Sequence, residues 1–305
     1  MLSIVALTGR PGEAPKCDHV TSVQHLPNSD PLRIAELIQL VFVCLLVLAS
    51  QLRPLNRTRR LSIALLAFVA IALIAAARFS AQWISPVASS ILRDWLPAAL
   101  MLVPYWQVGQ FFTGSDPATE ARLAKFDRIF FRWLGVQPAR TRIRVSLAVY
   151  LELAYVMDYA LIPLALLVLY TTGLRARVDF FWLVVLSATY VCFALTLFIR
   201  ASPPRILPGY KKFQIPPTPV RRLNRGILDH ASIQAITCPS AHVASSLAAA
   251  LVLLGVQPWV GLIFLWVALS IGIGTIVGGY HYVADVLLAA AVALLIFGAS
   301  LCMYR

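Results

Sequence analysis

Charged residues are scarce in this sequence, and acidic residues are the scarcest of them. Only 13% of the 305 residues are charged, with 13 Asp and Glu against 26 Lys and Arg, whereas 60% are hydrophobic. The mean hydropathy of +0.79 lies far above that of soluble globular domains. The composition excludes a water-soluble protein and predicts an all-α fold, a polytopic bundle of transmembrane helices.

Cysteine is also rare. The five cysteines are scattered along the chain, and no two of them form a C-x-x-C pair. Closely spaced cysteines are the usual sign of a disulfide framework or a zinc site, so we predict neither. Residues 1–33 likewise lack the basic-then-apolar order of a signal peptide, and we predict a loose polar tail there.

The formal net charge of +13 raises the question of nucleic-acid binding. The Lys and Arg residues lie in short loops between apolar runs rather than along one amphipathic face. This placement indicates no nucleic-acid partner and favours the anionic headgroups of a membrane bilayer.

Eight apolar segments are each long enough to cross a hydrocarbon core about 30 Å thick at about 1.5 Å per residue. The third is the least regular, because Arg93 and Asp94 lie at its edge and Pro97 and Pro104 interrupt it. The predicted spans are 34–50, 61–77, 95–113, 145–170, 179–199, 239–256, 259–277 and 282–303.

Two longer loops separate some of these spans. Residues 117–134 mix basic with aromatic side chains, which predicts an interfacial helix with its cations at the headgroups; a solvated loop is the alternative. Residues 200–237 carry six prolines, so we expect no long helix there. A long, proline-stiffened loop beside polar helix ends more often covers a site than merely connects two spans.

The segment Cys238-Pro239-Ser240-Ala241-His242 opens the sixth predicted span. A proline in the first turn of a helix leaves the next amides pointing outward at the positive end of the helix dipole, where phosphate binds. Ser240 adds a hydroxyl donor, and His242 lies close enough to protonate a leaving group. The alternative is plain helix capping by Thr237.

The segment from Gly278 to Asp285 opens the last predicted span. His281 and Asp285 lie four positions apart on one helix face, so the carboxylate can accept the Nδ1 proton and leave Nε2 free to attack. A structural pair is the alternative, but an ionisable pair inside an apolar span costs at least about 2.5–3.5 kcal/mol at mid-membrane and less near the surface, which favours a functional pair. An even number of crossings separates this segment from His242, so the two histidines can meet at one membrane surface.

A third polar segment, Ser202-Pro203-Pro204-Arg205, follows the fifth predicted span and precedes Lys211 and Lys212. Guanidinium and ammonium groups at this height would hold a phosphate and neutralise the charge that grows during its transfer. Taken singly, each residue is an ordinary membrane-surface cation. Their position on the same face as both histidines favours a phosphate site.

Together these segments resemble the three signatures of the type 2 phosphatidic acid phosphatase superfamily, over about residues 115–300. That family shows a basic first motif, a P-S-x-H second motif and a third motif ending in H-x-x-x-D. The resemblance is more specific to the inositolphosphotransferase-like branch that contains inositol phosphorylceramide synthases. There the first motif often reads P-P-R, as in Pro203–Arg205, and the third often reads H-Y-x-x-D, as in His281–Asp285. The stretch Asp127–Pro138 is also similar to that branch.

The resemblance implies a six-helix, phosphatase-like catalytic core, which we place in residues 114–305 after N-terminal transmembrane helices in 34–113. It implies a phosphohistidine intermediate and requires no metal or cofactor. The site residues it implies are His281 as nucleophile, Asp285 as its orienting partner, His242 as general acid, and Ser240 and Arg205 as ligands of the phosphate oxygens.

The match departs from the family pattern at two places. Ala241 stands where the superfamily usually has glycine, which is a mild change in a helix. The third motif usually begins with Ser-Arg, whereas this chain has Gly274 and Thr275 at that spacing. A phosphate-binding arginine is therefore missing, and Arg205 with Lys211 or Lys212 would have to replace it.

The resemblance implies an enzyme of lipid metabolism, a metal-independent phosphoric ester hydrolase or a headgroup phosphotransferase. Its substrate would be a phospholipid or polyprenyl phosphate, and an alcohol such as inositol is a possible acceptor in place of water. The sequence does not choose between the two acceptors. The alternatives are a transporter with a proton-relaying His281–Asp285 pair and an inactive member of the superfamily, which the missing arginine suggests.

We predict a multi-pass protein of the cell membrane. Of the 26 Lys and Arg residues, 18 fall on the face of the predicted site, which the positive-inside rule places in the cytoplasm. The resemblance points to an outward-facing site, so the orientation stays open. Glu152 and Asp158 lie six positions apart in the fourth span, and bonding to a neighbouring helix or lining an acceptor pocket are the two roles considered for them.

Overall fold

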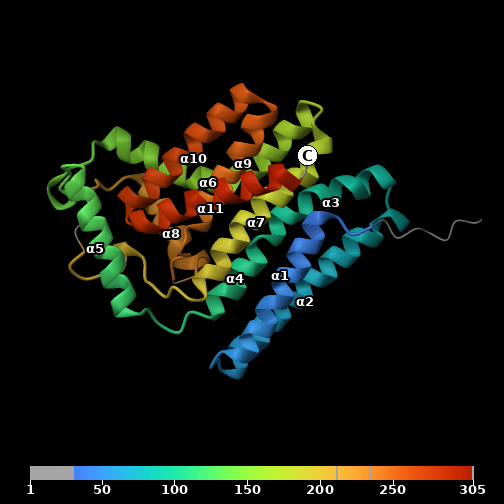
Figure 1. The fold of residues 1–305 in the computed structure, drawn as a ribbon, viewed down its shortest axis with the longest axis horizontal. Coiled ribbons are helices and arrows are strands. Elements are labelled where there is room, and N and C mark those ends of the chain that lie inside the picture. Colours follow the sequence, from blue (N-terminus) through green and yellow to red (C-terminus); the bar gives the residue numbers. More distant parts are fainter. Residues whose placement is uncertain (1–30, 211, 234, 304–305) are drawn as a thin grey trace, which may run out of the picture. The chain divides into compact units, whose positions relative to one another are not determined.

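The computed structural model describes residues 31–210, 212–233 and 235–303, which form helices and no β-strand. Residues 1–30 of the predicted tail lie outside this part of the chain. Figure 1 shows the helices as a bundle in which segments from both halves of the sequence lie side by side. The helices are α1 (Ile34–Leu52), α2 (Arg57–Phe79), α3 (Pro86–Leu100), α4 (Leu102–Gln110), α5 (Pro117–Trp133), α6 (Val145–Thr171), α7 (Val178–Thr196), α8 (Pro219–Ala231), α9 (Ala241–Val256), α10 (Pro258–Gly278) and α11 (Val283–Met303).

Seven helical segments of the described chain are long and apolar enough to cross a membrane, which confirms the multi-pass prediction. The sixth predicted span corresponds to α9, which has only 16 residues. At 1.5 Å per residue α9 is about 24 Å long, shorter than the hydrocarbon core. The prediction of eight similar spans is therefore wrong for α9.

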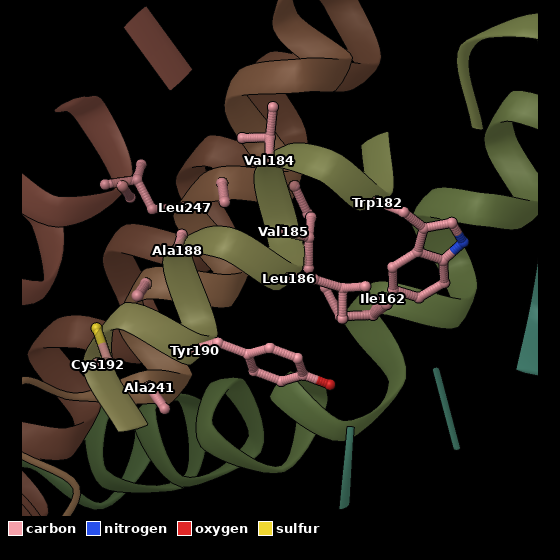
Figure 2. Packing of buried hydrophobic residues seen from close by; sticks show 14 of the residues in the cluster. Ile162, Trp182, Val184, Val185, Leu186, Ala188, Tyr190, Cys192, Ala241 and Leu247 are labelled. Carbon is pink, nitrogen blue, oxygen red and sulfur yellow. The ribbon is translucent and has the colours of Figure 1, made fainter. Parts of the chain in front are cut away.

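Helix α9 is short because it lies inside the bundle rather than against lipid. It packs against α6, α7, α10 and α11, and small side chains such as Ala244, Ala248 and Ala249 have no exposed surface. Figure 2 shows Ala188 and Cys192 of α7 close to α9. Small residues let helix backbones approach closely within a membrane bundle. A central helix with protein on all sides need not match the bilayer thickness.

The third span differs from its predicted position. It runs over Pro86–Gln110 rather than 95–113 and breaks at Met101 between α3 and α4. Pro104 accounts for the break, because its ring nitrogen cannot donate a hydrogen bond to the preceding turn. The polar residues Arg93 and Asp94 lie inside α3 and are buried, so low local hydropathy hid the beginning of the span.

The proline-rich segment 200–237 contains a 13-residue helix, which the sequence analysis did not expect. Five of its six prolines precede α8, and the sixth, Pro219, occupies the first turn. The missing N–H of a proline costs nothing in the first turn, since that group has no partner within the helix. Helix α8 then continues over twelve residues without proline. Against the expectation of no long helix in this loop, the part from Pro219 onward is helical over 13 residues.

The predicted interfacial helix 117–134 is present as α5. The side chain of Asp116 caps it by accepting hydrogen bonds from the backbone N–H groups of Ala118 and Thr119. Helix α5 packs beside the beginning of α11, at one end of the bundle (Figure 1). The polar motif segments lie at this end.

Candidate active site

His281 and Asp285 form a buried pair at the beginning of α11. Nδ1 of His281 lies 3.1 Å from Oδ2 of Asp285, and the same oxygen accepts a 3.3 Å hydrogen bond from the backbone N–H of Tyr282. Asp285 has no exposed surface, and His281 is 5% exposed. In the neutral ring, a carboxylate at this distance favours the tautomer with the proton on Nδ1, which leaves Nε2 with a free lone pair. The predicted i, i+4 contact is therefore present.

His242, in the first turn of α9, has a carboxylate partner of its own. Its Nδ1 lies 2.5 Å from Oδ2 of Asp158, a residue of α6 that is 84 positions away in the sequence. The side chain of His242 is 23% exposed, and that of Asp158 is 9% exposed. A carboxylate at this position holds the ring orientation and stabilises the protonated imidazole.

The two histidines meet, as their predicted position at one membrane surface requires. Their ring centroids are 6.1 Å apart and the planes cross at 77°, and both rings line a polar cavity of about 30 Å³. Neither Nε2 has a hydrogen-bond partner within the described residues. The structure thus presents two imidazole nitrogens, each with a carboxylate behind it, to one small cavity.

Arg205 lies in the same cavity wall. Its backbone N–H donates a 2.8 Å hydrogen bond to the carbonyl of Gly279, and its guanidinium lies 5.7 Å from the ring centroid of Tyr280. It forms no ion pair with a carboxylate in the described part of the chain. A cation held over an aromatic ring and lacking a carboxylate is suited to bind an anionic group.

The other predicted phosphate ligands lie elsewhere or cannot be placed. Lys212 is exposed and its ammonium group donates to the backbone carbonyl of Arg205. Lys211 lies outside the described residues. Ser240 has no exposed surface, and its Oγ accepts a hydrogen bond from Val243 N–H at the beginning of α9. Ser240 therefore caps α9 and does not line the cavity.

The geometry of the second motif segment differs in part from the prediction. Pro239 precedes α9 rather than forming its first turn, and its peptide bond with Cys238 is cis. The cap is Ser240, while the hydroxyl of Thr237, the cap considered from the sequence, accepts a 3.1 Å hydrogen bond from Ala241 N–H. Two hydroxyl groups thus satisfy the first amides of α9.

Backbone hydrogen bonds join the three motif segments to one another. Besides the bond from Arg205 to Gly279, the N–H of Ser240 donates to the carbonyl of Asp285 at 3.2 Å. Gly279 ends α10 with φ of 72°, a left-handed conformation that a residue with a Cβ rarely adopts. The following N–H groups, of Tyr280 and His281, both turn back to the carbonyl of Thr275. The end of α10 therefore sets the position of His281.

A second carboxylate of α6, Glu152, supports the wall of the cavity. It accepts hydrogen bonds from Arg221 Nη1 at 2.7 Å, Asn224 Nδ2 at 2.5 Å and the Tyr280 hydroxyl at 2.7 Å. Burial, and next the Glu152 carboxylate, raise the pKa of the Tyr280 phenol, which therefore stays protonated. The ring of Tyr280 stacks on Tyr155, with centroids 4.6 Å apart. Glu152 thus ties α8 to the third motif segment.

The segment after α8 forms part of the cavity wall, and α4 holds it there. The hydroxyl of Tyr105 in α4 accepts a 3.0 Å hydrogen bond from Ile233 N–H. At Gly109, one turn later in α4, a Cβ would lie only 2.2 Å from Cγ2 of Ile233. Both Tyr105 and Ile233 line the cavity. Residues from both ends of the proline-rich loop, including Pro203 and Thr237, thus line the cavity. That the loop covers the site stays a prediction.

Sequence reasoning gave no role to several of these residues. Asp158 and Glu152 were recognised only as charged groups within an apolar span, although this is the usual sign of a functional or paired residue. Both bond to neighbouring helices, one of the two options considered for them. The contact of Tyr105 with Ile233 spans 128 positions and left no signal in either segment.

Comparison with known proteins agrees with this arrangement. No curated protein and no solved structure matches the chain. Residues 121–299, which make up more than half of the 305, match the PAP2 superfamily. The matched region contains both histidines, their two carboxylate partners and Arg205. The chain therefore belongs to the PAP2 superfamily.

Proposed function

We propose that this protein is an integral-membrane phosphatase or headgroup phosphotransferase that acts on a lipid phosphate, diphosphate or phosphodiester through a phosphohistidine. The observation that carries the proposal is the pair of histidines, 6.1 Å apart, each with a carboxylate at Nδ1 and each facing one cavity. Membership of the PAP2 superfamily supports lipid phosphates as the substrate class.

In the first step, Nε2 of His281 attacks phosphorus as the bond from phosphorus to the leaving oxygen breaks. Asp285 stabilises the positive charge that develops on the imidazole. His242, protonated and held by Asp158, gives its Nε2 proton to the leaving oxygen. Arg205 neutralises charge on the phosphate oxygens. Ser240 contributes through its capping of α9.

In the second step, water or an alcohol attacks the phosphohistidine. Neutral His242 accepts the proton of the attacking hydroxyl, and the bond from phosphorus to Nε2 of His281 breaks. Attack by water completes a hydrolysis, whereas attack by an alcohol such as inositol completes a headgroup transfer. Both outcomes restore the starting protonation states.

Of these outcomes we propose transfer, as in the inositolphosphotransferase-like branch. The P-P-R sequence at Pro203–Arg205 and the H-Y-x-x-D sequence at His281–Asp285 support that branch.

The test is turnover in detergent micelles without added metal. Phosphatidic acid, a polyprenyl diphosphate and an inositol phospholipid would be offered with and without alcohol acceptors, to the parent protein and to His281→Asn. We expect turnover that the variant loses, and acceptor dependence separates transfer from hydrolysis. His230→Asn is the matched control, since His230 is exposed on α8. Full activity in His281→Asn would refute the phosphohistidine.

A further inference from the structure

The side of α5 that faces the bundle holds two of the three motif segments. Oε1 of Glu120 accepts a 2.9 Å hydrogen bond from the backbone N–H of Ser202, in the first segment. Oδ1 of Asp127 accepts a 2.9 Å bond from the N–H of Val283, which follows the catalytic histidine of the third segment by two residues. Any displacement of α5 is therefore transmitted to the groups that would hold and attack the phosphate.

The opposite side of α5 is apolar but exposed. Phe126, Ile129 and Trp133 are 41%, 56% and 78% exposed, and their spacing of three and four residues places them on one face of the helix. The buried side of α5 already packs on the bundle through Phe131. A helix with a second, outward apolar stripe needs another apolar environment to cover it.

Exposed cations flank this stripe, and they are Arg122, Lys125, Arg128 and Arg132. None of the four is ion-paired with a carboxylate in the described residues. The two acidic side chains of α5, Glu120 and Asp127, are both engaged on the bundle side. The outward side of α5 thus combines aromatic and cationic groups with no acidic group. This combination is complementary to an anionic phospholipid surface.

The position of α5 along the bundle fits such a surface. Helix α11 crosses the membrane from Val283, and α5 packs beside its first turn (Figure 1). Helix α6 begins its own crossing at Val145, shortly after α5 ends. The helix therefore lies at the level where two spans begin, which is the level of the lipid headgroups, and exposed tryptophans favour that layer.

We propose that the outward side of α5 binds the anionic lipid surface of the bilayer that the protein spans, a contact here called the seating of α5. Through Glu120 and Asp127, the seating holds the first and third motif segments in their positions relative to each other. Anionic lipid that is not itself the substrate then raises turnover. The seating is independent of the proposed function, whereas its effect on turnover rests on that function.

The seating is measured by fluorescence quenching in nanodiscs whose phospholipids carry bromine on the acyl chains. The full chain is compared with Trp133→Phe. We expect the parent protein to show a quenched component that the variant lacks, because bromine quenches tryptophan only at close contact. Equal quenching of the two proteins would overturn the seating, whatever the protein catalyses.

The charge dependence is measured by turnover in nanodiscs of phosphatidylcholine with and without phosphatidylglycerol, at one fixed fraction of substrate. The variant Lys125→Gln/Arg128→Gln/Arg132→Gln is expected to lose a several-fold stimulation by phosphatidylglycerol. The matched control, Arg140→Gln/Arg142→Gln/Arg144→Gln, removes three exposed cations from the loop after α5 and keeps the stimulation. Stimulation that is equal in both triple variants would overturn the role of α5.

The coupling is separated from the seating by Glu120. Glu120→Ala removes the acceptor of the Ser202 N–H and should lower the stimulation without changing the quenching of Trp133. Glu120→Gln keeps an oxygen acceptor and should retain most of the stimulation. An alanine variant with full stimulation would refute the coupling. Absence of turnover in every lipid mixture would refute the proposed function and with it the coupling, while the quenching still decides the seating.

Discussion

Two groups of buried charges in this molecule differ in what their charges face. The first, here called the N-terminal ion network, consists of Arg33, Glu36, Arg93, Asp94 and Arg175. Arg93 forms a bidentate pair with Glu36, at 2.6 and 2.8 Å, and Arg33 and Arg175 share the carboxylate of Asp94. The second group is the candidate site, where each carboxylate orients a histidine and Arg205 has no acidic partner within the described chain.

Helix α6 contributes a residue to both groups. The difference between the two groups therefore does not come from their lying on different helices. Asp158 of α6 bonds to His242, and Tyr170 of the same helix donates to Asp94. Twelve residues correspond to about 18 Å along a helix. The comparison teaches that burial of a charge is not by itself a sign of function. What distinguishes the candidate site is that the Arg205 guanidinium and the Nε2 atoms of the two histidines face a cavity without a hydrogen-bond partner among the described residues.

The largest effect is expected from Asp158→Asn. Asparagine cannot stabilise a protonated His242, so the general acid weakens and kcat should fall by about 10²–10⁴-fold. The measurement is turnover of a lipid phosphate beside an aryl phosphate ester, whose leaving group needs no proton. The aryl ester should lose much less activity. Asp179→Asn, exposed at the beginning of α7, is the control, and equal losses on both substrates would contradict the assignment.

Arg93→Met tests the N-terminal ion network. The substitution leaves Glu36 buried without its partner, which should lower the free energy of unfolding by about 3–5 kcal/mol. Unfolding in mixed micelles measures the loss. Adding Glu36→Leu removes the uncompensated charge and should restore most of the stability, because apolar groups can replace a buried ion pair.

Apolar residues can replace the Arg93–Glu36 ion pair, but they cannot restore activity at the two histidine–carboxylate pairs. This difference separates the N-terminal ion network from the candidate site. If Arg93→Met/Glu36→Leu were as unstable as the single variant, the network would have a role beyond neutralising its own charges.

Gly109→Ala is expected to have a smaller effect, on the cavity wall that follows α8. The new Cβ would lie 2.2 Å from Cγ2 of Ile233, so this segment must shift at a cost of about 1–3 kcal/mol. Turnover should fall several-fold, and Ile233→Ala in the same protein should restore part of it. Gly255→Ala adds a Cβ in open space and should be neutral. Additive losses in the double variant would exclude the contact.

The smallest effect is expected from Asp127, a buried carboxyl group with no cation partner in the described residues. Burial raises its pKa from 3.8 to about 6. The folded protein therefore holds this proton more tightly than the unfolded chain, and the stability contributed by Asp127 falls as the pH rises from about 4 to about 6.

Asp127→Asn removes this titration. Unfolding measured across that range should show the parent protein losing stability relative to the variant with rising pH, whereas Asp229→Asn, at an exposed position of α8, should follow the parent. A parent protein that gained stability relative to Asp127→Asn over the same range would show that the pKa is lowered.

The parts of the fold that could be predicted from sequence are those with a local signal. Apolar length identified seven spans, and the spacing of His281 and Asp285 predicted their contact, although His281 lies two residues before α11 rather than within it. The beginning of α3 was missed because Arg93 and Asp94 lower its hydropathy. Their burial is compensated by ion pairs with Glu36 of α1 and with Arg33, which precedes it, and the sequence does not show these pairs. Helix α8 was missed because prolines were counted over the whole segment rather than by position.

Contacts between distant segments could not be predicted in this way. Asp158 orients His242 across 84 positions, and no periodicity relates one helix to the other. Ser240 resembled a phosphate ligand because a hydroxyl at a helix beginning serves capping and anion binding equally well, and burial decides between them. The sequence therefore predicted which segments gather at the site, but not which partner each side chain has.

The backbone hydrogen bonds that join the motif segments bear on how substitutions at the site would change the protein during evolution. The N–H of Arg205 bonds to the carbonyl of Gly279, and the N–H of Ser240 bonds to that of Asp285, so the framework of the site does not depend on the reactive side chains. In the proposed mechanism, a chain without His281 would keep this framework and lose the nucleophile. A single substitution would then convert the proposed enzyme into a protein that binds lipid phosphate without turning it over.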